Sequence, residues 1–126
     1  MKPLIWVIGA NGLIGEALCR VARNKANAHV IATGSSPNLW YPEQLRAFIQ
    51  RWRPHIIINA AGQTNVDKAE SEIYESALTN ARGPALLAQW RCGAMFVHLS
   101  TDHVFDGMKR EPYRESDMPH PINAYG

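Results

Sequence analysis

Three glycines stand at a regular spacing near the start of the chain, at positions 9, 12 and 15 of the segment VIGANGLIG. They follow an apolar run and precede a stretch with helical periodicity. Such a turn lets a pyrophosphate approach the N–H groups and positive dipole end of a helix N-terminus. Gly9 fits the tight turn, Gly12 the approach of phosphate, and Gly15 the packing of helix on strand. The spacing predicts a dinucleotide site, the alternative being a purely structural strand-to-helix connection.

A second stretch suited to ligand binding is NAAGQTNVDKAE, residues 59–70, which also follows an apolar run. Residues 60–62 carry almost no side chain, as a backbone wall against a ribose or a nicotinamide requires, and Thr64 adds a hydroxyl. The alternative is that the stretch only begins a helix. We assign the helix cap to Asp67, which leaves the three small residues unexplained by capping.

The elements that must position these residues are short strands and longer helices. We expect parallel strands at four apolar runs that are too short for helices, at residues 4–8, 29–32, 55–59 and 94–99. We expect helices between them, at residues 12–24, 42–52 and 67–91. This βαβαβαβ order predicts an α/β fold: a Rossmann-type doubly wound parallel sheet, truncated, in a three-layer αβα arrangement. We expect residues 1–126 to form one NAD(P)-binding domain.

Two further local features concern the helix start and the C-terminal third. Pro42 is expected at the first helical position, and Glu70 is expected to complete a capping box with the cap at Asp67, Asn65 being the other candidate for that cap. After residue 100 the sequence becomes polar and rich in turn residues, which predicts a long ordered loop.

Composition narrows the functional class. The 126 residues are 46% hydrophobic and 19% charged, with a formal charge of +2 and no run of like charges, so we expect no nucleic-acid partner. No apolar run is long enough to span a membrane, so we expect no membrane partner. Two cysteines and the lack of a signal-peptide pattern favour the cytoplasm. None of the five histidines forms an i, i+4 pair, so we assign no metal.

The segment TGSSPN after the second strand bears on the choice of cofactor. Dinucleotide sites that prefer NAD place an acid there to hold the ribose 2′-hydroxyl, but Thr33, Ser35 and Ser36 occupy this segment and the next carboxylate is Glu43. A missing carboxylate permits a 2′-phosphate. We therefore expect NADP(H) or NAD(H), with NADP(H) slightly preferred; the alternative is a surface loop that contacts no cofactor.

Five motifs occur in order and carry a family resemblance: GANGLIG, NAAGQTNVDKAE, LTNARGPALLA, HLSTDHVFDG and PYRESDMPHPINAYG. Together they resemble the extended short-chain dehydrogenase/reductases, most closely the dTDP-4-dehydrorhamnose reductases. The regulatory β subunit of methionine adenosyltransferase is very similar through the same motifs. The resemblance implies reduction of the 4-keto group of a nucleotide-sugar in dTDP-L-rhamnose biosynthesis, or, as the alternative, a non-catalytic regulatory module.

The resemblance also implies roles for individual residues. Cofactor contacts fall on Gly9, Gly12, Leu13, Ile14, Gly15, Ala60, Ala61, Gly62, Gln63, Thr64, Asn80 and Leu99. Catalytic roles fall on Thr101, which orients the carbonyl, and on Tyr125, which donates the proton. Substrate contacts fall on Thr101, Asp102 and His103, although the family commonly carries tyrosine in place of His103.

The end of the chain leads to a further expectation. The family places a lysine four residues after the catalytic tyrosine, whose positive charge favours the tyrosinate, but the chain stops at Gly126. We therefore expect a fragment without the C-terminal substrate domain, inactive by itself. We also expect an uncovered apolar sheet face and a free sheet edge, through which the chain self-associates.

Overall fold

The computed structural model describes residues 2–25 and 27–126 and is built on one parallel sheet. Its strand order is β2-β1-β3-β4. The strands are β1 (Leu4–Ile8), β2 (His29–Thr33), β3 (Ile56–Asn59) and β4 (Met95–His98). Three parallel pairings join them, so the predicted parallel sheet is confirmed.

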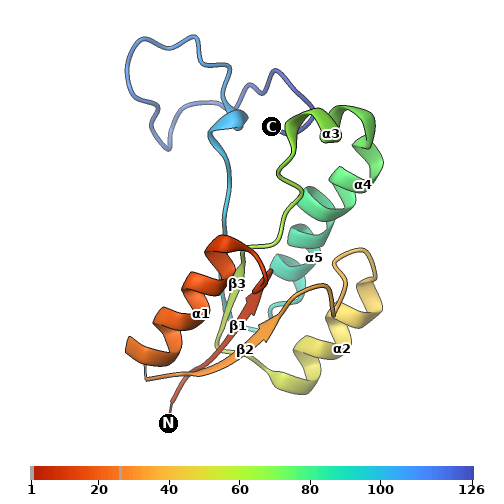
Figure 1. Cartoon of the computed structure of the whole chain (residues 1–126), viewed down its shortest axis with the longest axis vertical. Helices are drawn as coiled ribbons and strands as arrows, with labels where there is room; N and C mark the ends of the chain where they lie inside the picture. The colour runs from red at the N-terminus through yellow and green to blue at the C-terminus, as the bar shows by residue number, and fades with distance from the viewer. Residues whose placement is uncertain (1, 26) are drawn as a thin grey trace.

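Helices cover both faces of the sheet, which confirms the three-layer αβα arrangement (Figure 1). Because side chains alternate along a strand, β1 divides between two cores. Ile5 and Val7 pack with Cys19 of α1 (Leu13–Lys25) on one face. Trp6 and Ile8 pack on the other face, against α2 (Pro42–Trp52) and α5 (Gly83–Trp90).

The connection between β2 and α2 contains no strand. It buries Leu39, which is 6% exposed, in the core between α2 and α5. A Cβ added to Gly83 would lie 2.8 Å from the Leu39 Cβ, so α5 approaches this connection closely. Pro42 lies in the first turn of α2, as predicted, because its missing N–H costs nothing there.

The single helix predicted over residues 67–91 is wrong. The segment divides into α3 (Val66–Ser71), α4 (Ile73–Ala77), the π-helical turn η1 (Leu78–Arg82) and α5. Glu72 interrupts the helical backbone with φ −122° and ψ 53°. The wider π turn then shifts the helical register. As a result, Asn80 in this turn contacts Gln63 in the loop after β3, a contact that local periodicity does not predict.

The assignment of the helix cap to Asp67 is also wrong. Asn65 is the N-cap of α3, because its Oδ1 accepts a hydrogen bond from the Lys68 N–H at 2.9 Å. Asp67 lies in the first turn of α3, where its negative charge interacts favourably with the positive end of the helix dipole. Glu70 completes no capping box; its carboxylate accepts a hydrogen bond from the Ala124 N–H at 2.7 Å.

Residues 99–126 run beyond the carboxyl edge of the sheet as a long loop, as predicted (Figure 1). The only regular element in this segment is the 3₁₀ turn η2 (Asp102–Val104). Its last residues return beside α3, held by the contact between Ala124 and Glu70. Among the described residues, no helix combines the length and apolarity needed to cross a membrane.

The edge strand β4 is less covered than its near-continuous apolarity predicted. Met95 is 62% exposed and Val97 38% exposed. Both pair in register with Ile56 and Ile58 of β3, on the face of the sheet that carries α1. Since α1 lies over β1 and β2, this part of the apolar face remains open, in agreement with the expected uncovered face.

Candidate functional site

A cleft of about 300 Å³ opens at the carboxyl ends of the strands. It brings together residues that lie far apart in the sequence, from the glycine turn, the β3 loop, η1, the β4 end and the C-terminal loop. The predicted site residues that line it are Ile14, Ala60, Ala61, Gly62, Gln63, Thr64, Asn80, Leu99, Thr101 and Tyr125. His98, Ser100, Val104 and Gly126 complete the lining.

The glycine turn adjoins this cleft and is held by the last residue of β2. The N–H groups of Gly9 and Ala10 both donate to the Thr33 carbonyl oxygen, at 2.8 and 2.9 Å. Gly9 has φ +79°, and a Cβ on it would lie 2.6 Å from the Ala61 nitrogen. The turn therefore requires glycine for its backbone angle and for its contact with the loop after β3.

The three glycines of the turn have different surroundings. A Cβ on Gly15 would overlap the Gly9 carbonyl oxygen, so α1 packs closely on the glycine turn at this position. A Cβ on Gly12 would meet only that same oxygen, at 3.4 Å, and Gly12 is exposed. Leu13 is also exposed, at 89%. The space over Gly12 and the start of α1 is thus open to a ligand.

The loop after β3 forms a wall of the cleft and is fixed by two asparagines. Asn59 is fully buried, and its Oδ1 accepts a hydrogen bond from the Ala61 N–H at 3.2 Å. Asn80 accepts from the Gln63 N–H and donates to the Gln63 carbonyl, both at 2.8 Å. The predicted wall is therefore anchored from below by β3 and from the side by η1.

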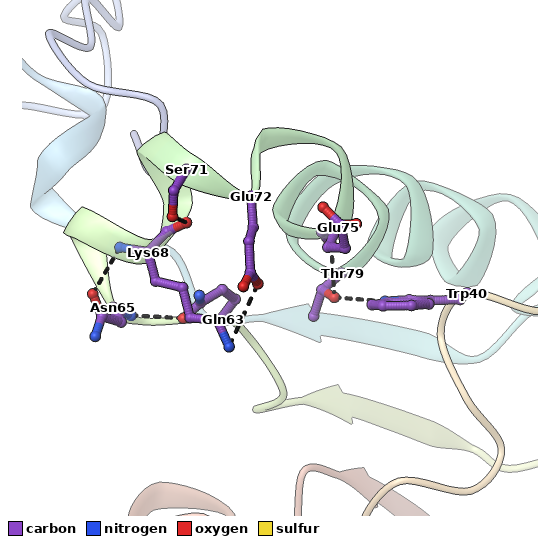
Figure 2. A network of polar contacts seen from close by, with 8 residues as sticks. All are labelled: Trp40, Gln63, Asn65, Lys68, Ser71, Glu72, Glu75 and Thr79. Atoms are coloured by element: carbon purple, nitrogen blue, oxygen red, sulfur yellow. Dashed lines mark hydrogen bonds and ion pairs between the residues drawn. The ribbon is translucent and has the colours of Figure 1, made fainter.

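Figure 2 shows how the same loop continues into α3 and how η1 is tied to the opposite side. Gln63 Oε1 accepts from the Asn65 N–H at 2.8 Å, just before the α3 cap. On η1, the Thr79 hydroxyl donates to the Glu75 carbonyl and accepts from Trp40 Nε1 at 2.8 Å. The η1 turn thus bridges the loop before α2 and the wall of the cleft.

A second hollow, of about 250 Å³, lies beside the first and shares Ala61 with it. It is formed by the connection after β2 and by η1. Its lining consists of Gly34, Ser35, Pro37, Asn38, Leu39, Trp40, Ala61 and Thr79. The two hollows offer room for an elongated ligand along the carboxyl edge of the sheet.

The residues after β4 place Thr101 and Tyr125 in the cleft. Thr101 Oγ1 accepts from the His103 N–H at 3.2 Å and donates to Asp102 Oδ1 at 3.2 Å. The His103 ring lies edge-on to the Tyr125 ring, with centroids 5.3 Å apart, and its Nδ1 contacts Asn123 Nδ2 at 3.0 Å. His103 therefore contacts both predicted catalytic residues, although neither it nor Asp102 is among the lining residues.

The loop beyond η2 is ordered around Asp106. Three hydrogen bonds, from the Met108 N–H, the Tyr113 hydroxyl and His120, lower the pKa of Asp106 to about 2. Phe105 and Tyr113 stack with ring centroids 4.1 Å apart. This polar and aromatic network gives the segment after the cleft a defined path without regular secondary structure.

Sequence reasoning missed His98 and Val104 as lining residues. His98 ends β4 in register with Asn59 at the end of β3, and its Nδ1 lies 3.1 Å from Asn59 Nδ2. Partial burial lowers the pKa of His98 below its ordinary value. The available signal was a polar residue near the end of each of two neighbouring apolar strands. Within residues 2–25 and 27–126, no group of three or more potential metal ligands is present.

The fold and the glycine turn define a Rossmann-type class, and comparison with known proteins gives the family. Residues 1–126 match the family described as RmlD substrate binding domain, so the chain belongs to that family. A dTDP-4-dehydrorhamnose reductase from Burkholderia thailandensis is 40% identical over 124 residues, covering 97% of this chain and 41% of the relative. Methionine adenosyltransferase 2 subunit beta from Xenopus laevis is 35% identical over 130 residues, covering 95% of this chain and 38% of that relative.

Solved structures show the same likeness. A dTDP-4-dehydrorhamnose reductase from Clostridium acetobutylicum superposes with a TM-score of 0.91 at 36% identity, covering 98% of this chain and 45% of that one. The dTDP-4-dehydrorhamnose reductase from Bacillus anthracis, described in complex with NADP, has a TM-score of 0.91 at 35% identity, covering 99% of this chain and 45% of that one. The chain spans about two fifths of the length of the curated reductases that it matches.

Proposed function

We propose that residues 1–126 are the NADP(H)-binding domain of a reductase that acts on the 4-keto group of a nucleotide-sugar, in dTDP-L-rhamnose biosynthesis. One observation carries the proposal: a single cleft gathers the small-residue wall at 60–62, Asn80, Thr101 and Tyr125. The reductase relatives, which are named for dTDP-4-dehydrorhamnose, support the choice of substrate.

The cofactor would lie along the carboxyl edge of the sheet. The glycine turn would hold the pyrophosphate, the hollow lined by Asn38 and Trp40 the adenosine, and the wall at 60–62 the nicotinamide. When bound, NADPH supplies the hydride. Support for NADP(H) comes from the neutral hydroxyls of Ser35 and Ser36, since a carboxylate there would repel a 2′-phosphate.

Two side chains would serve the reaction itself. The Thr101 hydroxyl would donate a hydrogen bond to the sugar carbonyl oxygen, and the Tyr125 phenol would give its proton to the developing alkoxide. Both side chains line the same cleft as the wall at 60–62, which supports these roles. Asp102 and His103 are proposed to contact the substrate next to Thr101.

Calorimetric titration of the chain tests the cofactor assignment. We expect NADPH to bind at least as tightly as NADH. A clear preference for NADH would contradict the assignment of NADP(H), and binding of neither would overturn the proposed function.

A regulatory module is the second candidate, favoured by the similarity to the methionine adenosyltransferase subunit. Titration of the chain with a methionine adenosyltransferase catalytic subunit distinguishes the two candidates. The reductase proposal predicts no complex, whereas a stable complex, together with cofactor binding that does not lead to NADPH oxidation by dTDP-4-dehydrorhamnose, would favour the regulatory role.

Location and assembly are further parts of the proposal. We place the protein in the cytoplasm, which is supported by two cysteines that are both free, Cys19 buried and Cys92 exposed. We also propose self-association through β4, which is supported by its position at the sheet edge and by the exposure of Met95 and Val97.

A further inference from the structure

The buried Asn59 and the exposed His98, which lines the cleft, form a polar pair at the base of the cleft wall. Asn59 is the last residue of β3, is fully buried, and lies directly opposite His98 in the β3–β4 register. Its side chain has two contacts: Oδ1 with the Ala61 N–H at 3.2 Å and Nδ2 with His98 Nδ1 at 3.1 Å. A buried amide at this position depends on both contacts, since an unsatisfied polar group is costly in the interior.

These contacts determine the protonation of His98. The Ala61 N–H can only donate a hydrogen bond, so the oxygen of the Asn59 amide must face it and the NH₂ group must face His98. An NH₂ group also only donates, and Nδ1 of His98 must therefore accept. The ring is consequently neutral, with its proton on Nε2, because both nitrogens of a protonated imidazole are donors.

The surroundings of His98 favour this neutral form. Partial burial of the ring lowers the pKa of His98. No other residue of β3 or β4 is titratable, and the side chains that line the cleft add only the phenol of Tyr125. In η1, Asn80 lines the cleft and the only charged residue, Arg82, is exposed.

We propose that His98 is a positioning residue that holds the cofactor wall in its binding conformation and makes dinucleotide binding sensitive to pH. Protonation would convert Nδ1 from acceptor to donor and bring two donors face to face. In the proposed response the Asn59 amide turns its oxygen toward the protonated ring, which removes the acceptor of the Ala61 N–H. Since the Ala61 backbone forms the wall and supports Gly9, the dinucleotide site loosens. This inference rests on the proposed function of the cleft.

Calorimetry with NADP⁺ between pH 5.5 and 8, on the chain and on two variants, tests the effect on binding. We expect the affinity of the unmodified chain to fall about 2- to 12-fold more toward pH 5.5 than that of His98→Asn, since one hydrogen bond is lost. His98→Asn keeps an acceptor near the position of Nδ1 that does not titrate, so comparison with it removes the contribution of the 2′-phosphate. His98→Phe should bind weakly at every pH. Equal pH dependence in all three proteins would overturn the proposal.

Nuclear magnetic resonance of the cofactor-free chain provides a readout that does not need binding. As the pH falls, the amide signal of Ala61 should move, and its protection factor against exchange with water should fall, with the same midpoint as the ring signals of His98. In His98→Asn the amide should show no such transition. If Ala61 follows His98 while no dinucleotide binds, the proposed function fails and the positioning role stands. If the amide signal of Ala61 does not change as His98 titrates, the positioning role is wrong even when NADP⁺ binds.

Discussion

Gly12 and Gly15 belong to the same turn, but a side chain would meet different surroundings at the two positions. At Gly15 an added Cβ overlaps backbone of the turn, whereas at Gly12 its nearest neighbour is an oxygen at 3.4 Å. Identical residue types three positions apart therefore have different functions: one is required by packing and the other leaves a space open. The structure separates a position where packing requires glycine from one where a side chain would have room.

The first prediction uses this difference. Gly12→Val should keep the fold and weaken NADPH binding at least about tenfold, because the side chain would occupy the path of the pyrophosphate. Gly15→Val, the matched control, should lower the thermal unfolding temperature because it overlaps backbone. Calorimetry and thermal unfolding measure the two effects. Unchanged affinity in Gly12→Val would show that the turn is only structural.

At the scale of elements, the π turn η1 is where the helical segment meets the site. Its Asn80 makes two hydrogen bonds with the backbone of Gln63, and its Thr79 hydroxyl accepts a hydrogen bond from the Trp40 indole. A regular helix would change the register of these side chains, since a π turn contains an extra residue. The irregular turn thus lets one helical segment hold two loops that flank the cleft.

The second prediction concerns Asn80. Asn80→Ala should lower the free energy of unfolding by about 1–3 kcal/mol, because the N–H and carbonyl groups of Gln63 lose their partner. NADPH affinity should fall as well, since the wall of the cleft loses its lateral anchor. Gln89→Ala, at an exposed position of α5, is the control and should change stability by less than about 0.5 kcal/mol. Urea unfolding measures both variants, and equal stability would contradict the anchoring role.

The third prediction concerns the loop around Asp106. Its pKa is lowered from 3.8 to about 2 by the hydrogen bonds from Met108, Tyr113 and His120. A lowered pKa means that the folded loop favours the carboxylate, so its contribution to stability is complete above about pH 4 and is lost as the pH falls toward 2. The protection factor of the Met108 amide, which is its exchange rate relative to that of an unstructured amide at the same pH, should fall over that range. In Asp106→Asn this loss of protection should be absent, and the same acid transition in that variant would contradict the role of Asp106.

At the scale of the whole molecule, the covering of the sheet is uneven. Both faces of β1 are buried, whereas β4 exposes Met95 and Val97 beside a free edge. Parallel sheets are ordinarily covered on both faces, so this face favours contact with further polypeptide. This exposed apolar surface is the one through which we propose that the chain self-associates.

The fourth prediction tests that surface. Sedimentation of the chain should show concentration-dependent association through β4, and Val97→Lys should reduce it, because a charge on an edge strand opposes pairing. Val21→Lys, at an apolar position of α1 that is 50% exposed, is the control and should leave association unchanged. A stable monomer at high concentration would contradict self-association.

Much of the fold and part of the site could be predicted from local sequence. Short apolar runs, rich in β-branched or aromatic residues, identified all four strands within one residue at each end, and the spacing of Gly9, Gly12 and Gly15 located the turn. The family motifs identified ten of the residues that line the cleft. The cap at Asp67 was wrong, because both candidates are chemically suitable and only the backbone at Asn65 places its oxygen at the Lys68 N–H.

The sequence by itself determined the α/β class, the glycine turn and the small-residue wall, because these depend on neighbouring residues and on the periods of strand and helix. Tertiary structure decided the interruption of the helix at Glu72, the π turn and the pairing of Asn59 with His98. The partners in these contacts lie far apart in sequence: 39 positions separate Asn59 from His98, and 17 separate Gln63 from Asn80. Local patterns carry no information about such pairs, since their proximity arises only when the strands pair and the helices pack on them.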